Sequence, residues 1–165
     1  MELETLNNEF KLAMRRLAST VAIVTSGGEE GWTGMVATAV TSVAVNPPTV
    51  LVVVNRNASL SPVLMREGRF CVNLLSQRHA RIVGAFSGQK KGRERFEEGP
   101  WTSSEGGIPV LTDAVASLIC KTVNTLEMAT HTIFVGEVTD VHCHDQIDPL
   151  IWVDGHLARA ESVAA

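Results

Sequence analysis

Short apolar runs, most of them rich in valine, alternate with polar turns along most of the chain. Residues 50–54 read Val-Leu-Val-Val-Val, and β-branched residues of this kind are enriched in strands. The segments between the runs, such as residues 26–31 with their three glycines, have the composition of tight turns. The strands predicted from this pattern are residues 21–25, 32–44, 49–55, 70–75, 109–125, 132–142 and 150–157.

Helical spacing of apolar residues is confined to three segments. Residues 6–18 predict a helix with one apolar stripe, because their apolar side chains recur three or four positions apart. Residues 63–66, which end shortly before Gly68, and residues 77–86 predict two further short helices. The stripe of the first helix consists of Phe10, Ala13, Met14 and Leu17.

Strands joined by turns, with few and short helices, predict a mainly β fold in which an antiparallel sheet closes into a barrel. The length of 165 residues fits a single domain over residues 1–165. Residues 87–107 are rich in glycine and charge, which predicts a mobile loop. The basic residues of this loop, Lys90, Lys91, Arg93 and Arg95, alternate with acidic ones, so we expect a solvated surface there.

Charge and cysteine usage narrow the classes of function. A net charge of -4 and a pI near 5.7 argue against a nucleic-acid binder, which normally carries a basic face. Three widely spaced cysteines make no disulfide framework and fit a reducing compartment. The sequence opens without a basic, apolar leader, and no run approaches the ~20 apolar residues of a membrane span. We therefore expect a cytoplasmic protein that binds neither nucleic acid nor membrane.

The familiar motifs of phosphate, nucleophile and metal chemistry are absent from the sequence. There is no G-x-G-x-x-G after a strand, no Walker loop and no H-E-x-x-H. The run His142-Cys143-His144-Asp145 contains ligand-type residues, but on a strand the two histidines share one face while Cys143 points to the other. A closed metal site would need ligands from elsewhere, so we expect an exposed strand end and no metal.

Two segments have compositions that suit ligand binding. Residues 34–43 combine strand character with small residues and hydroxyls, which let a ligand approach the backbone; an ordinary barrel strand is the alternative. In residues 53–59, Arg56 follows a buried strand and could bind an anionic group through charge-assisted hydrogen bonds. The alternative there is a capped helix start, with Ser59 or Ser61 as the N-cap, and both interpretations can hold together.

These segments belong to a longer series of motifs that resembles a known family. The chain resembles the short-chain NAD(P)H:flavin oxidoreductases of the flavin reductase-like, FMN-binding split-barrel group over nearly its whole length. The order and spacing of the motifs carry the resemblance more than any one of them does. The motifs are Phe10-x3-Met14, Gly34-Met35-x-Ala37-x-Ala39-x-Thr41-Ser42-Val43, Asn46-Pro47-Pro48, Val54-Asn55-Arg56-x2-Ser59, Gly68-Arg69-Phe70-x-Val72-Asn73, Arg95-Phe96, Trp101, Ala116-x3-Cys120, residues 131–138 and Pro149-Leu150-Ile151-Trp152.

The resemblance implies a six-stranded antiparallel Greek-key split barrel that forms a homodimer, with flavin sites near the interface. It places the flavin ring beside residues 35–38, the ribityl chain or phosphate beside Ser42, and the phosphate end at residues 55–59. It also implies flavin contacts from residues 86–88 and a catalytic role for His131 near the nicotinamide. The implied cofactor-binding residues are Met35, Val36, Ala37, Thr38, Ser42, Asn55, Arg56, Ser59, Phe86, Ser87 and Gly88.

The function implied by the resemblance is an NAD(P)H-dependent flavin reductase, which transfers a hydride from NADH or NADPH to FMN or FAD. Such an enzyme supplies reduced flavin to a separately encoded monooxygenase. Hydride transfer is the chemistry of the two cofactors, so the absence of a nucleophile or triad agrees with it. The alternatives are a tightly bound flavin for electron transfer, a pyridoxamine-phosphate-oxidase-like activity, and a non-catalytic flavin- or haem-binding split-barrel module.

Overall fold

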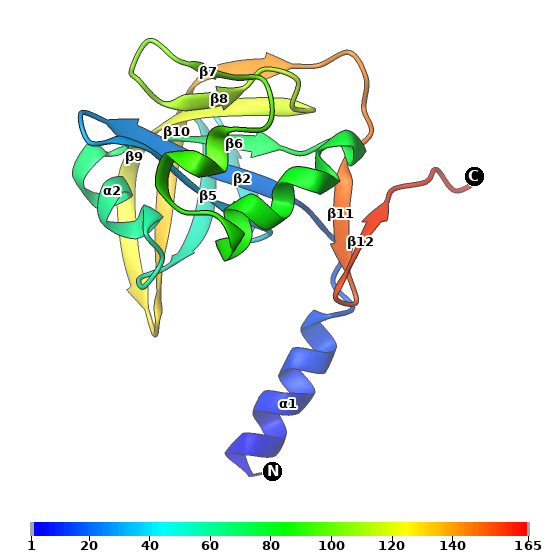
Figure 1. Cartoon of the computed structure of the whole chain (residues 1–165). Coiled ribbons are helices and arrows are strands. Elements are labelled where there is room, and N and C mark those ends of the chain that lie inside the picture. Colours follow the sequence, from blue (N-terminus) through cyan, green and yellow to red (C-terminus); the bar gives the residue numbers. More distant parts are fainter. Residues whose placement is uncertain (1, 165) are drawn as a thin grey trace.

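The computed structural model describes residues 2–164 and is dominated by strands (Figure 1). Two α-helices and three short helical segments, η1 to η3, accompany them. In chain order the elements are α1 (Leu3–Met14), β1 (Ser19–Thr20), β2 (Ala22–Gly28), β3 (Gly31–Ala37), β4 (Val40–Val45), β5 (Pro48–Asn55), α2 (Leu60–Glu67), β6 (Arg69–Leu74), η1 (Gln77–Ile82), η2 (Ala85–Gln89), η3 (Gly92–Phe96), β7 (Trp101–Ser103), β8 (Pro109–Leu111), β9 (Ala116–Met128), β10 (His131–Cys143), β11 (Leu150–Val153) and β12 (His156–Arg159). The prediction of a mainly β fold is confirmed.

The main sheet has seven strands in the order β3-β2-β6-β9-β10-β5-β4, and every pairing is antiparallel. This differs from the six strands implied by the resemblance, because the predicted strand over residues 32–44 is divided at Thr38 and Ala39. There the Val40 N–H bonds back to the Thr38 carbonyl at 3.0 Å, and the Val53 N–H donates to the Ala39 carbonyl at 3.1 Å. The two edge strands, β3 and β4, are therefore consecutive in the chain. They do not pair with each other in the described residues, so the predicted closure of the sheet into a barrel is not observed.

Two other predicted strands are also divided. The segment 150–157 forms the hairpin β11–β12, because Asp154 and Gly155 have φ angles of 50° and 76° and reverse the chain. The segment 109–125 contains β8, which pairs with β7, and the long strand β9 of the main sheet. In both places polar residues interrupt the apolar pattern, Asp154-Gly155 in the first and Thr112-Asp113 in the second, so the breaks were marked in the sequence and the prediction passed over them.

One apolar cluster fills the inside of the curved sheet beneath α2. Its fully buried members come from four strands of the sheet, β2, β5, β6 and β10, and from α2, and valine predominates among them. Gly136 has a specific role here, because a Cβ at that position would lie 2.5 Å from Cζ of Phe70. The side chains with no exposure are Ala22, Val24, Val52, Val54, Leu60, Leu64, Phe70, Val72 and Phe134.

A second cluster covers the opposite side of β2 and β3, where η1, η2 and η3 cross the sheet. Phe96 lies at its centre, with ring centroids 5.1 Å from Phe86, 5.0 Å from Trp101 and 5.3 Å from Trp32. These aromatic contacts fold most of the segment predicted as a mobile loop over residues 87–107. That prediction was wrong because it followed the glycine and charge content of the segment and overlooked Phe96 and Trp101, which anchor it in the cluster.

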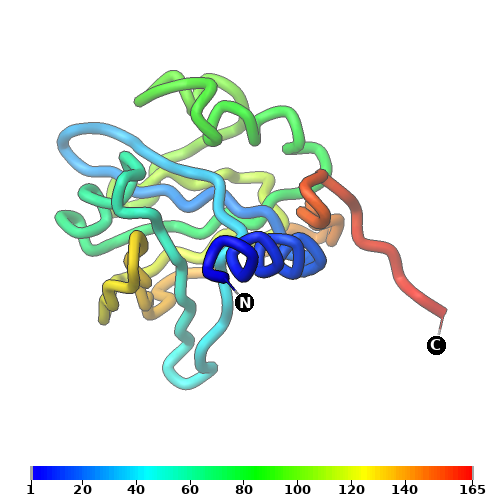
Figure 2. The backbone as a smooth tube through the Cα atoms, turned by 90° about the horizontal axis from the view of Figure 1, so that it is seen from below, coloured from blue at the N-terminus to red at the C-terminus, as the bar shows by residue number. Residues whose placement is uncertain are grey.

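The helix α1 extends away from the body of the protein in Figure 1, and in the view from below it lies in front of the body (Figure 2). None of its residues is buried. Its C-terminal end is held by Arg15, whose Nε lies 3.0 Å from Asp154 Oδ1 in the β11–β12 turn. Among residues 2–164, no helix has the length and apolar character needed to cross a bilayer.

Candidate functional site

The chain reverses between the end of β5 and the start of α2, and this turn carries three of the predicted site residues. The Asn55 side-chain oxygen accepts from the Asn57 N–H at 2.9 Å, and the Asn55 carbonyl accepts from the Ala58 N–H at 2.9 Å. Ser59 occupies the N-cap position of α2, but its hydroxyl makes no capping bond to the helix. The hydroxyl is therefore available to a ligand from outside, whereas the Ser61 N–H is bonded to the Ala58 carbonyl at 3.0 Å and Pro62 has no N–H.

A guanidinium group from a distant segment reaches this turn. Arg95 of η3 donates through Nη1 to Ser59 Oγ at 3.1 Å and to Thr33 Oγ1 at 3.3 Å. Arg95 was expected on a solvated surface, and that expectation was wrong. Its neighbour Phe96 is buried in the aromatic cluster and anchors η3, so Arg95 is directed at α2. The signal in the sequence was the Arg-Phe pair within the glycine-rich segment.

Arg56 extends from the same turn in another direction. Its Nη2 donates to the Ala129 carbonyl, and its Nη1 lies 3.6 Å from Glu127 Oε2, both near the β9–β10 turn. The side chain remains 44% exposed. Arg56 therefore joins the start of α2 to the tip of the β9–β10 hairpin while keeping donors accessible to solvent.

Together these groups form a cationic site at the N-terminus of α2. Two guanidinium groups, from Arg56 and Arg95, approach a turn that ends in a helix whose dipole is positive at this end. Guanidinium forks and a hydroxyl are donors that proteins use for phosphate. The arrangement can therefore hold a phosphate monoester or diester.

His131 lies next to this site on β10. The sheet register pairs His131 with Asn55 of β5 on one side and with Met128 of β9 on the other. Its Nδ1 lies 2.9 Å from the Thr130 hydroxyl, which limits rotation of the ring. The structure thus brings together four predicted residues, namely His131, Asn55, Arg56 and Ser59.

The predicted residues of β3 and η2 form a second group. Val36 packs with Phe86 in the aromatic cluster, whereas Met35 and Ala37 face the sheet interior. A Cβ at Gly34 would lie 3.1 Å from Phe86 Cε1, so the small residue permits η2 to approach β3. In η2, the Ser87 hydroxyl donates to the Val83 carbonyl at 2.7 Å, and Gly88 has a φ of 108°, which favours glycine.

The last two predicted residues, Thr38 next to Ala37 and Ser42 on β4, have other surroundings. Thr38 borders a cleft of about 470 Å³ together with Phe10 and Met14 of α1 and Trp152 of β11. Ser42 pairs with Val50, five residues before Asn55 on β5, which corresponds to roughly 17 Å along the strand. Ser42 therefore does not join the phosphate donors of Arg56 and Ser59.

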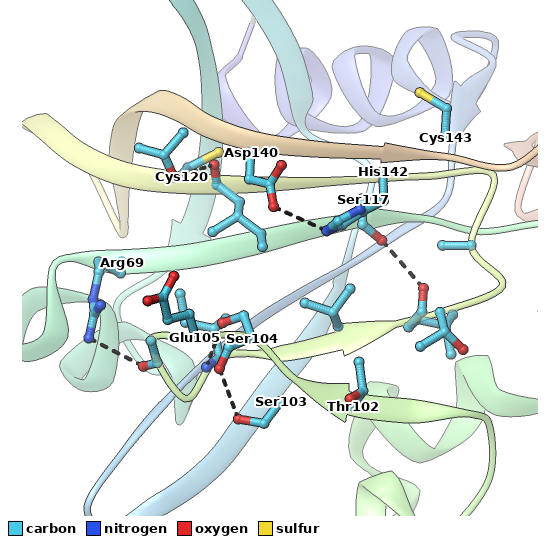
Figure 3. A pocket seen from close by; sticks show the side chains of 18 of the residues that line it. Arg69, Thr102, Ser103, Ser104, Glu105, Ser117, Cys120, Asp140, His142 and Cys143 are labelled. Atoms are coloured by element: carbon cyan, nitrogen blue, oxygen red, sulfur yellow. Dashed lines mark hydrogen bonds and ion pairs between the residues drawn. The ribbon is translucent and has the colours of Figure 1, made fainter.

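A cavity of about 1040 Å³ contains none of the predicted site residues (Figure 3). It lies between the β7–β8 hairpin and the outer side of β9 and β10. His142 Nε2 lies 3.2 Å from Asp140 Oδ2 at its wall, and Cys143 points away from this pair. Burial raises the pKa of the lining Cys120 thiol to about 12, so it is no nucleophile at neutral pH. Within the described residues, no three ligand-type side chains gather for a metal.

Comparison with known sequences identifies relatives over almost the whole chain. The sequence profile of a family described as flavin reductase like domain matches residues 14–161. The chain is 39% identical over 147 residues to an FMN reductase (NADH), RutF, of Cronobacter turicensis, and this match covers 89% of each chain. It is 33% identical over 159 residues to the reductase component of an FADH(2)-dependent resorcinol hydroxylase of Rhizobium sp., covering 95% of this chain and 89% of that protein.

Comparison with solved structures gives the same result for the fold. The NADH:FAD oxidoreductase SgcE6 of Streptomyces globisporus, solved in complex with NAD and FAD fragments, superposes with a TM-score of 0.89 at 27% identity. The superposition covers 100% of both chains. The whole fold, including α1 and the β11–β12 hairpin, is therefore shared with that protein.

Proposed function

This chain belongs to the flavin reductase-like domain family, and on that basis we propose that it is a flavin reductase that transfers a hydride from NADH or NADPH to FMN or FAD. The observation that carries the proposal is the cationic site formed by Arg56, Arg95 and Ser59 at the start of α2. The nicotinamide named for the FMN reductase relative supports NADH as the donor.

The donor set of this site fits the phosphate of a flavin nucleotide. The Ser59 hydroxyl makes no bond to its own helix and receives one from Arg95 at 3.1 Å, so its oxygen lone pair is used and its proton is free to donate. Arg56 supplies a second guanidinium with solvent-exposed donors. Four predicted residues, Asn55, Arg56, Ser59 and His131, would then surround the phosphate end and the adjoining nicotinamide.

A bound flavin would supply the ring that accepts the hydride, and the protein would hold the flavin and nicotinamide rings in position. The donor carbon of the nicotinamide must come within about 3–3.5 Å of the acceptor atom, which requires two flat rings held in parallel. Residues of the β3 segment, from Val36 to Thr38, are small enough to leave this space. His131, whose Nδ1 lies 2.9 Å from the Thr130 hydroxyl, orients the nicotinamide amide or supplies a proton.

The reduced flavin serves a separately encoded oxygenase. The relative in the resorcinol hydroxylase system, a reductase component, supports this role. The chain acts as one domain over residues 1–165. This domain is a split barrel whose edge strands are β3 and β4. The protein works as a homodimer. Three free cysteines, Cys71, Cys120 and Cys143, support a cytoplasmic location.

The direct test mixes the purified protein with NADH or NADPH and either FMN or FAD under anaerobic conditions. Absorbance is followed near 340 nm for the nicotinamide and near 450 nm for the flavin, and both are expected to fall together. The variant Arg81→Ala is a control for the loss of an arginine outside the site, because Arg81 is exposed and lies in η1 away from α2, and it is expected to reduce flavin as the wild type does. Flavin binding without loss of NADH or NADPH would overturn the enzyme proposal and favour the non-catalytic module.

A further inference from the structure

One acidic side chain lies against the cationic site at the start of α2. Glu127 Oε2 is 3.6 Å from Arg56 Nη1, and Arg56 Nη2 donates to the Ala129 carbonyl of the same hairpin. Arg95 differs from Arg56, because its Nη1 donates to the neutral hydroxyls of Ser59 and Thr33. Of the two guanidinium groups assigned to the flavin phosphate, Arg56 is therefore the one that contacts an anion of the chain itself.

The sheet register places Glu127 on the side of the sheet on which α2 packs. Glu127 pairs with Thr132 of β10, and Thr132 pairs with Val54 of β5. Thr132 and Val54 are 4% and 0% exposed, and Val54 belongs to the apolar cluster beneath α2. Residues paired across neighbouring strands share one side of a sheet. The carboxylate of Glu127 is therefore on the same side as the start of α2, and a phosphate bound there would lie near it.

The β9–β10 turn keeps Arg56 within reach of Glu127. The Arg56 N–H donates to the Thr130 carbonyl at 3.0 Å, so the backbone of Arg56 is bonded to the turn. Ala129, the other residue of this turn, has a φ of 51°, and its carbonyl accepts from the Arg56 side chain. The guanidinium can change its partner by rotation of the side chain alone, while the backbone stays bonded to the turn.

The pair between Arg56 and Glu127 is of the kind that exchanges partners readily. The two side chains are 44% and 75% exposed, and exposed ion pairs contribute little to stability. A phosphate monoester carries more negative charge than a carboxylate and accepts two parallel bonds from a guanidinium. A phosphate can therefore displace Glu127 from Arg56, but the displaced carboxylate then stands beside a second anion.

We propose that Glu127 competes with the flavin phosphate for the Arg56 guanidinium, and that this competition keeps flavin binding weak enough for reduced flavin to leave. The inference rests on the proposed function, because a reductase that serves a separate oxygenase must release its product. Glu127 opposes binding in two ways, since the phosphate must break its contact with Arg56 and is then repelled by its charge. Both effects act on the phosphate and leave the flavin ring untouched.

The first experiment measures the Kd and the dissociation rate of oxidised FMN and of riboflavin by flavin fluorescence. Glu127→Gln keeps the size of the side chain and removes its charge, and Glu127→Lys reverses the charge. We expect Glu127→Gln to lower the Kd for FMN at least about threefold and Glu127→Lys to lower it about tenfold, mainly through slower dissociation. The Kd for riboflavin, which lacks the phosphate, is expected to stay within about twofold. An unchanged Kd for FMN, or an equal fall for riboflavin, overturns the proposal.

Glu137→Gln is the matched control, because it removes a carboxylate from the same hairpin. Glu137 lies six residues after His131 on β10, which corresponds to about 20 Å along the strand. This variant is expected to bind FMN as the wild type does. A fall in Kd equal to that of Glu127→Gln would show an effect of net charge alone and overturn the competition.

The second experiment is a double-mutant cycle, which asks whether Glu127 acts through Arg56. In an Arg56→Ala background there is no guanidinium to compete for, so Glu127→Gln is expected to lose most of its effect on the Kd for FMN. An effect of the same size in both backgrounds overturns the competition.

The same variants separate this inference from the proposed function. A wild-type chain that reduces FMN with NADH or NADPH, together with a Glu127→Gln chain that binds FMN no more tightly, overturns the inference and leaves the function intact. A wild-type chain that binds FMN without oxidising either nicotinamide overturns the function, and the Kd values still decide whether Glu127 competes with the phosphate.

Discussion

The outer side of the main sheet has two regions with similar apolar side chains, and other segments of the chain cover only one of them. Over β2 and β3, the segment from η1 to β7 supplies Phe86, Phe96 and Trp101, which bury the outward residue Ile23 and partly cover Val36 in an aromatic cluster. Over β5 and the ends of β9 and β10 next to their turn, no comparable segment lies in residues 2–164, and Leu126 and Met128 stay exposed. Whether a strand face is covered therefore depends on what the rest of the chain brings to it.

Two asparagines show the same contrast in polar groups. Asn73 is fully buried, and its amide donates to the Ile23 carbonyl and accepts from Leu111 N–H and the Ser117 hydroxyl, at 2.9 to 3.0 Å. Asn55 lies at the edge of the bare region, and its side chain accepts only a local bond from Asn57 in the described structure. A saturated amide holds strands together, whereas an amide with free donors can bind a ligand.

The largest predicted effect follows removal of the central ring of the covered region. Phe96→Ala is expected to lower the free energy of unfolding by about 3–5 kcal/mol, because three aromatic neighbours lose their common partner. Leu126→Ala on the bare region is expected to lower Tm only at protein concentrations at which the dimer forms. Thermal unfolding at two concentrations a hundredfold apart measures both. A Phe96→Ala chain as stable as wild type would remove the contrast.

The second effect compares the two asparagines. Asn73→Ala is expected to lower the free energy of unfolding by about 2–4 kcal/mol, because it leaves the buried Leu111 N–H and Ser117 hydroxyl without this acceptor. Asn55→Ala is expected to change stability by less than about 1 kcal/mol and to raise the KM for flavin. Urea unfolding and steady-state kinetics of both variants decide this, and exchanged phenotypes would contradict the assignment of their roles.

Much of the fold could be predicted from the sequence, and the failures have physical causes. Valine-rich runs located β2, β5, β6 and β10, because a continuous apolar run bounded by turns is typical of a buried strand. The division at Thr38 and Ala39 could not be predicted, since the bend depends on a bond between Ala39 and Val53 of another strand. The pattern also cannot show which apolar face will be covered, because that depends on distant segments.

The candidate site was predicted in part for similar reasons. Arg56 and Ser59 follow a buried strand directly, so the local sequence located them at the start of α2. Arg95 was missed because it lies 36 residues from Ser59 in the chain, and its direction depends on the burial of Phe96 in the aromatic cluster. Charge alternation around Arg95 suggested solvent, although a single buried aromatic neighbour outweighs that local pattern.

A pH-dependent stability effect concerns the buried thiols. Burial raises the pKa of Cys71 from 9.0 to about 12, with a smaller contribution from Cys120, whose own pKa burial also raises to about 12. Above pH 9 the unfolded chain loses these protons and the folded chain keeps them, so this contribution to stability declines between pH 9 and 12. The slope is about 1.4 kcal/mol per pH unit for each thiol.

Urea unfolding at pH 8 and pH 10 measures this decline, and the absence of tyrosine removes phenol titration from the range. Cys120→Ala is expected to show a smaller loss between the two pH values than the wild type, whatever its absolute stability. An equal loss would contradict the account of the thiols. Exposed Cys143 serves as the control, because Cys143→Ala should leave the pH dependence unchanged.

The central claim is that Arg56 and Arg95 bind the phosphate of a flavin nucleotide at the start of α2. The measurement is the KM for FMN and for riboflavin, which lacks the phosphate, in wild type and in the double variant Arg56→Ala/Arg95→Ala. The account predicts that the KM for FMN rises about tenfold or more, with little change in kcat, while the KM for riboflavin stays within about twofold. An equal rise for both flavins, or no rise for either, would contradict it.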